Sequence, residues 1–111
     1  MLSKENRLNL KTSFRWVAQG KSFTSQNFKL YYRLGENEHP LVGVSIVSAQ
    51  FKKSNLRNQA KRIMFDLSMN NWDQLHKNLN LVIMPRSQVL DLPVKQLDDE
   101  FKHALHSLKI N

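Results

Sequence analysis

A chain of 111 residues suits one domain with a real but modest hydrophobic core. It carries 17 Lys and Arg against 9 Asp and Glu, and this net charge of +8 favours nucleic acid or an anionic membrane surface as a partner. It has no cysteine and no apolar run near the roughly 20 residues that cross a bilayer, which excludes disulfides, thiolate metal sites and a transmembrane helix.

The positive charge is concentrated in the first part of the chain. Residues 1–62 hold 12 Lys and Arg and 3 Asp and Glu, which gives a net charge of +9. Residues 63–111 hold 5 Lys and Arg and 6 Asp and Glu, which gives a net charge of −1. We therefore expect the binding surface in the first part. Residues 1–7 lack the apolar stretch of a signal peptide, so the sequence predicts a soluble cytoplasmic protein.

A short helix is predicted after the N-terminal segment. Thr12 and Ser13 can cap it, and Gly20 can close it. Trp16 projects away from its apolar stripe, and both an interface role and a partly buried surface position fit that residue. The stripe consists of Phe14, Val17 and Ala18.

Two strands are predicted next. Residues 23–34 alternate loosely as a strand does, with room for a further short strand around residues 20–34. The polar stretch 35–40 predicts a hairpin loop and residues 41–47 the returning strand, in which Gly43 indicates a bulge or a close backbone approach. The alternation places Phe28, Leu30 and Tyr32 on one side, and Lys29, Tyr31 and Arg33 on the other.

The most informative stretch is 51–62, which places five cations and no acid at the opening of a predicted helix. Ser54 or Asn55 can cap this helix, whose first turn also favours an anion. Leu56, Ala60, Ile63, Met64 and Leu67 form its apolar stripe, and Arg57, Asn58, Lys61 and Arg62 spread over the opposite side. The cationic side is interpreted as a phosphate-binding surface, with a merely solvated basic face as the alternative.

The C-terminal part predicts a buried strand and a final helix. Residues 79–84 form an apolar run that Pro85 ends, and Pro93 lies where a helix can start. Glu100, His103 and His106 share one side of that helix at a spacing that could touch a metal, although a solvated helix face is the preferred interpretation. The element order is therefore α-β-β-(β)-α-β-α. The apolar stripe of the final helix is Leu97, Phe101, Ala104, Leu105 and Leu108.

Taken together, these features resemble the bacterial ribonuclease P protein component over nearly the whole chain. The basic helix that follows a Val-Gly-x-Ser strand is the most specific part of the resemblance. The matching residues are Asn6-Arg7-Leu8, Phe14, Gly20, Phe28-Lys29-Leu30-Tyr31, Val42-Gly43-Val44-Ser45-Ile46, Arg57-Asn58-Gln59-Ala60-Lys61-Arg62, Leu81-Val82-Ile83 and Asp91-Leu92.

The resemblance implies an α+β fold: a single-domain α/β sandwich over residues 1–111, with a mixed sheet and the basic helix in a left-handed βαβ crossover. It implies a protein subunit of ribonuclease P that binds the catalytic RNA and the 5′ leader of precursor tRNA, and so aids endonucleolytic removal of the leader. It further implies that the protein supplies no catalytic group and holds no metal alone, because Mg²⁺ ions bound by the RNA perform the chemistry. Neither a membrane nor a small-molecule substrate is expected as a partner.

Two groups of site residues follow from the resemblance and the local charge. For Phe14 and Phe28, an ordinary place in the core is the alternative to a place in a leader-binding cleft. A basic groove with aromatic platforms suits a single strand. The residues expected to bind the catalytic RNA are Lys52, Lys53, Arg57, Asn58, Lys61, Arg62 and Phe65, and those expected to bind the leader are Phe14, Phe28, Lys29, Tyr31 and Arg33.

The chain also departs from the family pattern. Gln59 and Phe65 stand where relatives carry arginines, and Ala18 stands where an aromatic residue is frequent. Phe65 falls on the polar side of the helix, where it either stacks on RNA or is covered by the C-terminal part of the chain. Ser48-Ala49 replaces a lysine pair, for which Lys52-Lys53 partly compensates.

Two rival functions remain from the sequence. A non-catalytic RNA-binding module, such as a ribosomal protein or an RNA chaperone, would have the same charge and the same basic helix. A membrane-surface helix is a weaker rival, because the apolar stripe of the basic helix is needed for the core.

Overall fold

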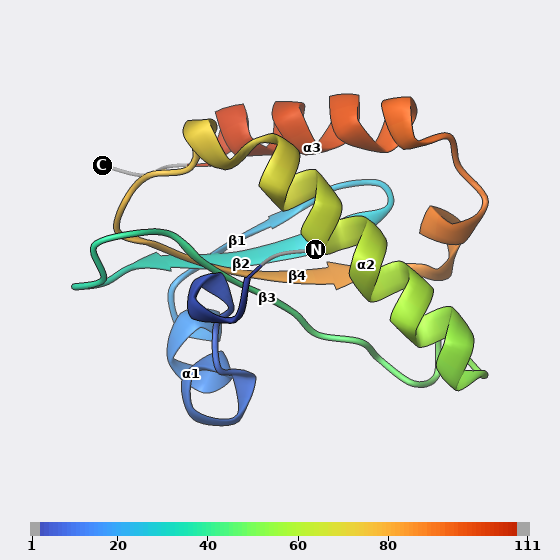
Figure 1. Cartoon of the computed structure of the whole chain (residues 1–111), viewed down its shortest axis with the longest axis horizontal. Helices are drawn as coiled ribbons and strands as arrows, with labels where there is room; N and C mark the ends of the chain where they lie inside the picture. Colours follow the sequence, from blue (N-terminus) through green and yellow to red (C-terminus); the bar gives the residue numbers. More distant parts are fainter. Residues whose placement is uncertain (1–2, 109–111) are drawn as a thin grey trace.

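The computed structural model describes residues 3–108, which are built around a four-stranded sheet in the order β1-β2-β4-β3. The sheet is mixed: β1–β2 and β2–β4 pair antiparallel, and β3–β4 pair parallel. Helices α2 and α3 cover one face, and α1 lies on the other (Figure 1). The elements are η1 (Lys4–Asn6), α1 (Leu10–Ala18), β1 (Lys21–Thr24), β2 (Phe28–Leu34), β3 (Leu41–Val44), α2 (Ser54–Asn70), η2 (Trp72–Gln74), β4 (Leu79–Pro85), η3 (Ser87–Leu90) and α3 (Val94–Ser107).

This order confirms the predicted α-β-β-(β)-α-β-α pattern, with β1 as the further short strand. The predicted hairpin loop at 35–40 is wrong, because β4 lies between β2 and β3 and the loop passes over its end. A polar loop reports a change of direction but not which strands pair. The all but fully buried strand β4 takes the centre, where both its edges are hydrogen-bonded. The left hand of the β3–α2–β4 crossover stays a prediction.

The starts of two helices differ from expectation. Helix α1 begins at Leu10, earlier than the expected cap at Thr12 and Ser13, and Asn9 caps it by accepting a hydrogen bond from the backbone N–H of Lys11 at 3.1 Å. The earlier start brings Leu10 against the sheet. Helix α2 has Lys53 at its cap position with no capping side-chain hydrogen bond, so neither Ser54 nor Asn55 caps it.

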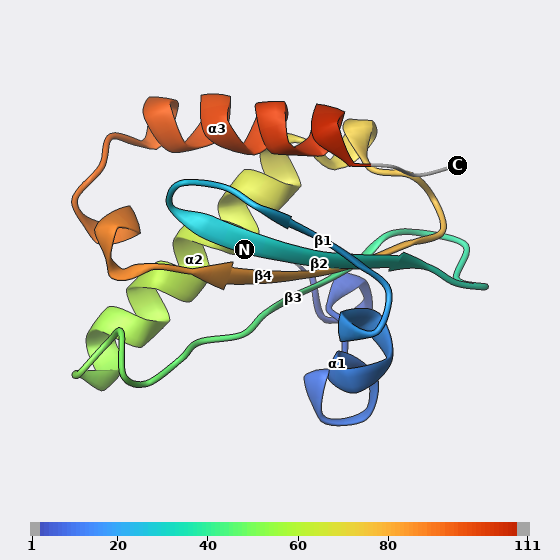
Figure 2. The same cartoon turned by 180° about the vertical axis from the view of Figure 1, so that it is seen from behind.

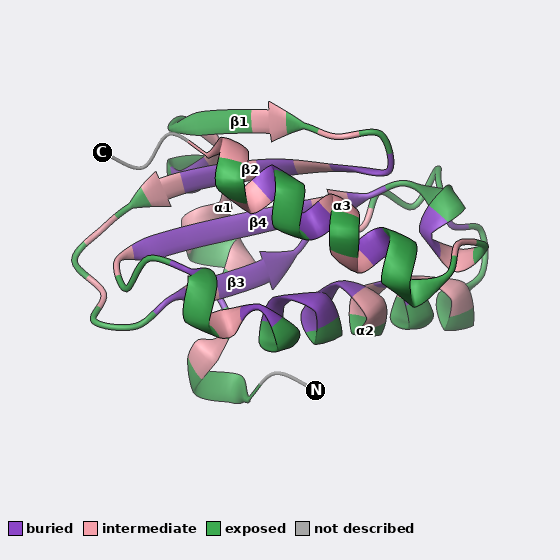
Figure 3. Cartoon of the chain, turned by 90° about the horizontal axis from the view of Figure 1, so that it is seen from above, coloured by how far each residue is buried: buried purple, intermediate pink, exposed green. Residues whose placement is uncertain are grey.

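Two apolar clusters hold the layers together. The larger lies between the sheet and helices α2 and α3, where Phe28 and Phe101 meet with ring centroids 6.0 Å apart. The smaller lies under α1 and contains Leu8, Val17 and Val82. A Cβ atom on Gly43 would lie 2.7 Å from the Leu10 side chain, so this glycine permits the close approach that the sequence suggested. Figure 3 shows the buried residues gathered along the strands and the inner sides of α2 and α3.

Helix α3 is joined to the turn between β1 and β2 by one carboxylate. Glu100 accepts hydrogen bonds from the Ser25 hydroxyl and from the backbone and side-chain N–H groups of Asn27, at 2.9 and 2.7 Å for the latter two. Glu100 is therefore a structural residue rather than one member of a metal site. Within residues 3–108, no group of three or more His, Asp or Glu side chains is placed to hold a metal. No helix in this range is both long and apolar enough to cross a membrane.

Candidate nucleic-acid interfaces

The first candidate interface is the outer side of α2 and the residues that lead into it. Its exposed part includes two lysines before the helix and one arginine two turns inside it. The side chains at 57 and 61 are only half exposed, because they lie at the border between the core and the solvent side. The predicted residues that are exposed are Lys52, Lys53, Asn58 and Arg62.

Arg57 has a structural contact that its position in the basic motif did not reveal. Its Nε donates a hydrogen bond to the backbone oxygen of Phe51 at 2.9 Å, and Phe51 is buried in the main core. Since α2 lacks a side-chain cap, this bond ties its first turns to the preceding loop. Arg57 therefore supports the entry to the helix, and Lys52, Lys53 and Arg62 present their charge more freely.

Phe65 does not lie on the exposed outer side of α2, and the expectation that it stacks on RNA is wrong for the folded protein. It is 4 % exposed and belongs to the main core. The guanidinium of Arg7 lies 5.4 Å from its ring centroid, and Arg7 forms a parallel bridge with Val42 at the edge of β3. Phe65 is thus covered within the main core, which also contains residues of α3, and Arg7 of the N-terminal segment lies over its ring. A helical wheel cannot show this, because it does not report a second element that packs against the flank.

The second candidate interface lies on the α1 face of the sheet. The ring of Tyr31 meets Phe14 edge to face, with centroids 6.2 Å apart, and the Lys29 Nζ lies 4.8 Å from the Tyr31 ring centroid. Beside them is a hollow of about 260 Å³. It places an aromatic ring, a lysine and an arginine around one opening. The hollow is lined by Lys29, Tyr31, Val47, Gln50, Met84, Pro85 and Arg86.

Arg86 and Gln50 belong to this hollow although the sequence prediction missed them. Arg86 follows the last residue of β4, and the Gln50 side-chain oxygen accepts a hydrogen bond from the backbone N–H of Ser87 at 3.2 Å. The polar residues that follow a buried strand were the available signal for Arg86. Nothing in the sequence pairs Gln50 with this position, because the hydrogen bond from Ser87 to Gln50 joins two distant loops.

Two of the residues predicted for the leader cleft lie elsewhere. Phe28 is fully buried against Phe101 on the opposite face of the sheet, so its prediction as a cleft residue is wrong. The alternation of side chains along β2 already separated Phe28 from Tyr31, since residues at odd spacing point to opposite faces. Arg33 is on the correct face, but it contacts Trp16 rather than the Tyr31 hollow.

The view from behind shows α1 on the face of the sheet opposite α2 and α3, with the N-terminal segment beside it (Figure 2). Phe14 and Trp16 leave this helix in different directions, one toward Tyr31 and the other toward Arg33. The α1 face therefore carries two separate aromatic positions, and the α2 interface is a third, mainly cationic surface.

The chain was compared with known proteins. The family model described as Ribonuclease P matches residues 2–109. The ribonuclease P protein component of Pseudoalteromonas atlantica is 29 % identical over 96 residues, which cover 86 % of this chain and 79 % of that protein. The ribonuclease P protein component of Finegoldia magna is 28 % identical over 86 residues, which cover 78 % of this chain and 74 % of that protein.

The solved structures agree with these matches at the level of the fold. The ribonuclease P protein from Thermotoga maritima superposes with a TM-score of 0.85 at 20 % identity, covering 94 % of this chain and 98 % of that one. The sheet order and the positions of α1, α2 and α3 are thus those of a ribonuclease P protein. The chain belongs to the ribonuclease P protein family, as a protein component of that endoribonuclease whose partner is the ribonuclease P RNA.

Proposed function

We propose that this chain binds the catalytic RNA of ribonuclease P through the outer side of α2, and the 5′ leader of precursor tRNA through the hollow beside Tyr31. The observation that carries the second assignment is the grouping of Phe14, Tyr31 and Lys29 on an open part of the sheet. An aromatic ring flanked by a cation is the arrangement that holds an unpaired base and its phosphate without reading sequence.

The outer side of α2 suits the larger RNA partner. Lys52, Lys53 and Arg62 are exposed at the start of α2 and two turns inside it, and several separate cations fit phosphates of an RNA backbone rather than a single base. The exposed amide of Asn58 lies among them and can donate to a phosphate or a ribose oxygen. This surface contributes affinity by charge, so it should depend strongly on salt.

We further propose that Mg²⁺ bound by the RNA supplies the chemistry, as the family resemblance implies, and that the particle works in the cytoplasm. The polar and aromatic side chains of the two interfaces are lysines, arginines, amides and the rings of Phe14 and Tyr31. Such groups position RNA, and the task that fits them is to hold the precursor tRNA against the catalytic RNA.

The test compares Tyr31→Ala and Arg62→Ala in the reconstituted holoenzyme. Tyr31→Ala should lower the preference for precursor tRNA over mature tRNA by about fivefold or more, the low end of base stacking, with little change in affinity for the catalytic RNA. Arg62→Ala should weaken binding of the catalytic RNA and reduce the salt slope by about one phosphate. Lys95→Ala, an exposed lysine on α3, is the matched control.

If Tyr31→Ala weakened the binding of precursor tRNA and of the catalytic RNA equally, the leader assignment would be refuted. The rival assignment as a non-catalytic RNA-binding module makes a different prediction. The RNA that co-purifies with the protein would then be ribosomal, and the protein would not stimulate cleavage of precursor tRNA by the catalytic RNA.

A further inference from the structure

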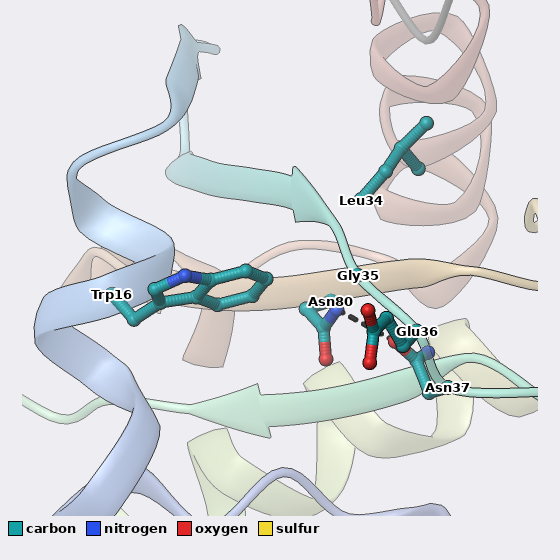
Figure 4. Close-up of a pocket in the computed structure, with 6 residues that line it drawn as sticks. All are labelled: Trp16, Leu34, Gly35, Glu36, Asn37 and Asn80. Carbon is teal, nitrogen blue, oxygen red and sulfur yellow. Dashed lines mark hydrogen bonds between the residues drawn. The ribbon is translucent and has the colours of Figure 1, made fainter.

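A second hollow lies on the α1 face, and the family assignment does not explain it. Its volume is about 560 Å³, within the roughly 300–1,000 Å³ that small-molecule sites occupy. It shares no lining residue with the hollow beside Tyr31. Figure 4 shows the indole of Trp16 reaching from α1 toward the end of β2 and the loop that follows it. The lining residues are Trp16, Leu34, Gly35, Glu36, Asn37 and Asn80.

The indole of Trp16 is a prepared stacking surface. It is 38 % exposed, although its position is held by Arg33, whose guanidinium lies 4.5 Å from the ring centroid. The same guanidinium donates a hydrogen bond to the backbone oxygen of Trp16 at 3.1 Å. Arg33 does not line the hollow, so it supports the indole from outside it. Trp16 itself lines the hollow and is partly exposed, so its ring can be reached by a ligand there.

Gly35 sets the distance between the indole and the opposite wall. A Cβ atom at this position would lie 3.0 Å from Cη2 of Trp16 and 2.8 Å from Nδ2 of Asn80. A side chain there would therefore displace the indole or the amide. The hollow exists in this form because position 35 has no side chain.

The polar wall of the hollow offers acceptors and has its donors occupied. Asn80 is 4 % exposed, and its Nδ2 donates to the backbone oxygens of Arg33 and Asn78 and to Oδ1 of Asn37. No residue in the range 3–108 donates a hydrogen bond to the Asn80 Oδ1. This oxygen is also not completely buried, so a ligand can reach it. Glu36 is exposed and forms no ion pair within this part of the chain.

The donors of the second amide in the wall are also occupied. The Asn37 Nδ2 donates to the backbone oxygens of His39 and Leu79, at 2.7 and 3.2 Å. A ligand in this hollow would therefore meet an aromatic face, the Asn80 Oδ1 and the Glu36 carboxylate. A flat ligand that presents N–H donors matches this set.

We propose that this hollow binds one unpaired nucleotide of a bound RNA, stacked on Trp16, with the amino group of its base directed at Glu36 and Asn80. Guanine fits best, because its adjacent N1–H and N2–H donors match a carboxylate. Uracil fits worst, because its edge carries two carbonyl oxygens. The negative charge of Glu36 favours entry of the base and not of the phosphate. This inference rests on the proposed RNA-binding function and adds a base-selective site to it.

The test uses the full chain and the nucleotides GMP and UMP, which carry the same phosphate. The readout is the indole N–H signals in two-dimensional NMR, with half-buried Trp72 in the main core as an internal control. GMP should shift the Trp16 signal and not that of Trp72. UMP should bind at least about fivefold more weakly than GMP. Glu36→Gln should remove most of this preference, whereas Glu38→Gln, on the same exposed loop, should retain it.

Gly35→Ala closes the hollow and should abolish the response of Trp16 to GMP. A thermal melt shows whether Gly35→Ala still folds. If it does not, Glu36→Gln still tests the proposal, because Glu36 is an exposed residue whose change should not affect folding. No shift of the Trp16 signal with GMP, or equal binding of GMP and UMP, would overturn the proposal. The leader assignment is tested separately, because Tyr31→Ala should leave the GMP response of Trp16 intact whatever it does to leader binding.

Discussion

Phe65 offers the sharpest test of how α2 is embedded in the fold. The side chain is 4 % exposed within the main core, and the Arg7 guanidinium lies over its ring. Truncating a buried phenylalanine to alanine costs about 3–5 kcal/mol of stability. In a domain of this size each kcal/mol corresponds to about 4–8 °C in Tm, so Phe65→Ala should lower Tm by at least about 12 °C. Phe65→Arg should lower it further, because it places a charge in an apolar site.

The assay is a thermal melt followed by circular dichroism, with RNA affinity measured at two or more salt concentrations. Gln59→Arg is the matched control, because it adds the same charge to the same helix at an exposed position. It should leave Tm unchanged and steepen the salt dependence of RNA binding by about one phosphate. A wild-type melt for Phe65→Arg, together with a steeper salt dependence, would refute the burial argument and place Phe65 on the RNA-facing side.

Three further changes test other contacts. Glu100→Ala removes the acceptor that joins α3 to the turn between β1 and β2. It should lower the free energy of unfolding by about 1.5–3 kcal/mol, measured by denaturant titration. An unchanged midpoint would show that the turn is stable without Glu100. The pKa of Asp98 lies below its ordinary value of 3.8, chiefly because Asn71 donates a hydrogen bond to it, with Lys102 adding to the effect and burial opposing it. The stability contributed by ionised Asp98 is therefore present above the unfolded pKa and is lost as the pH falls through the lowered folded pKa. The advantage of the wild type over Asp98→Asn should shrink below about pH 5, and a difference that is constant on acidification would contradict this. Arg57→Ala should lower both Tm and RNA affinity, whereas Arg62→Ala should lower affinity alone, and equal melting of the two would show that the bond from Arg57 to the preceding loop adds nothing.

Local sequence patterns predicted the elements and much of the charged surface. Period-two alternation located β2 and separated its two faces, and the apolar run before Pro85 located β4. The start of α3 after Pro93 and the run of cations at the opening of α2 were equally readable. These signals are local, because they depend on backbone geometry over a few residues and on which side chains avoid water.

Contacts between distant segments were decided only by the tertiary structure. The position of β4 between β2 and β3 depends on pairing across more than thirty residues, which no loop composition reports. Phe65 is buried in a core shared by several elements, and the Arg7 guanidinium over its ring comes from an N-terminal segment that pairs with β3. The contact of Arg33 with Trp16 likewise joins a strand to a helix. Sequence periodicity specifies the direction in which a side chain leaves its own element, whereas packing decides which other element it meets there.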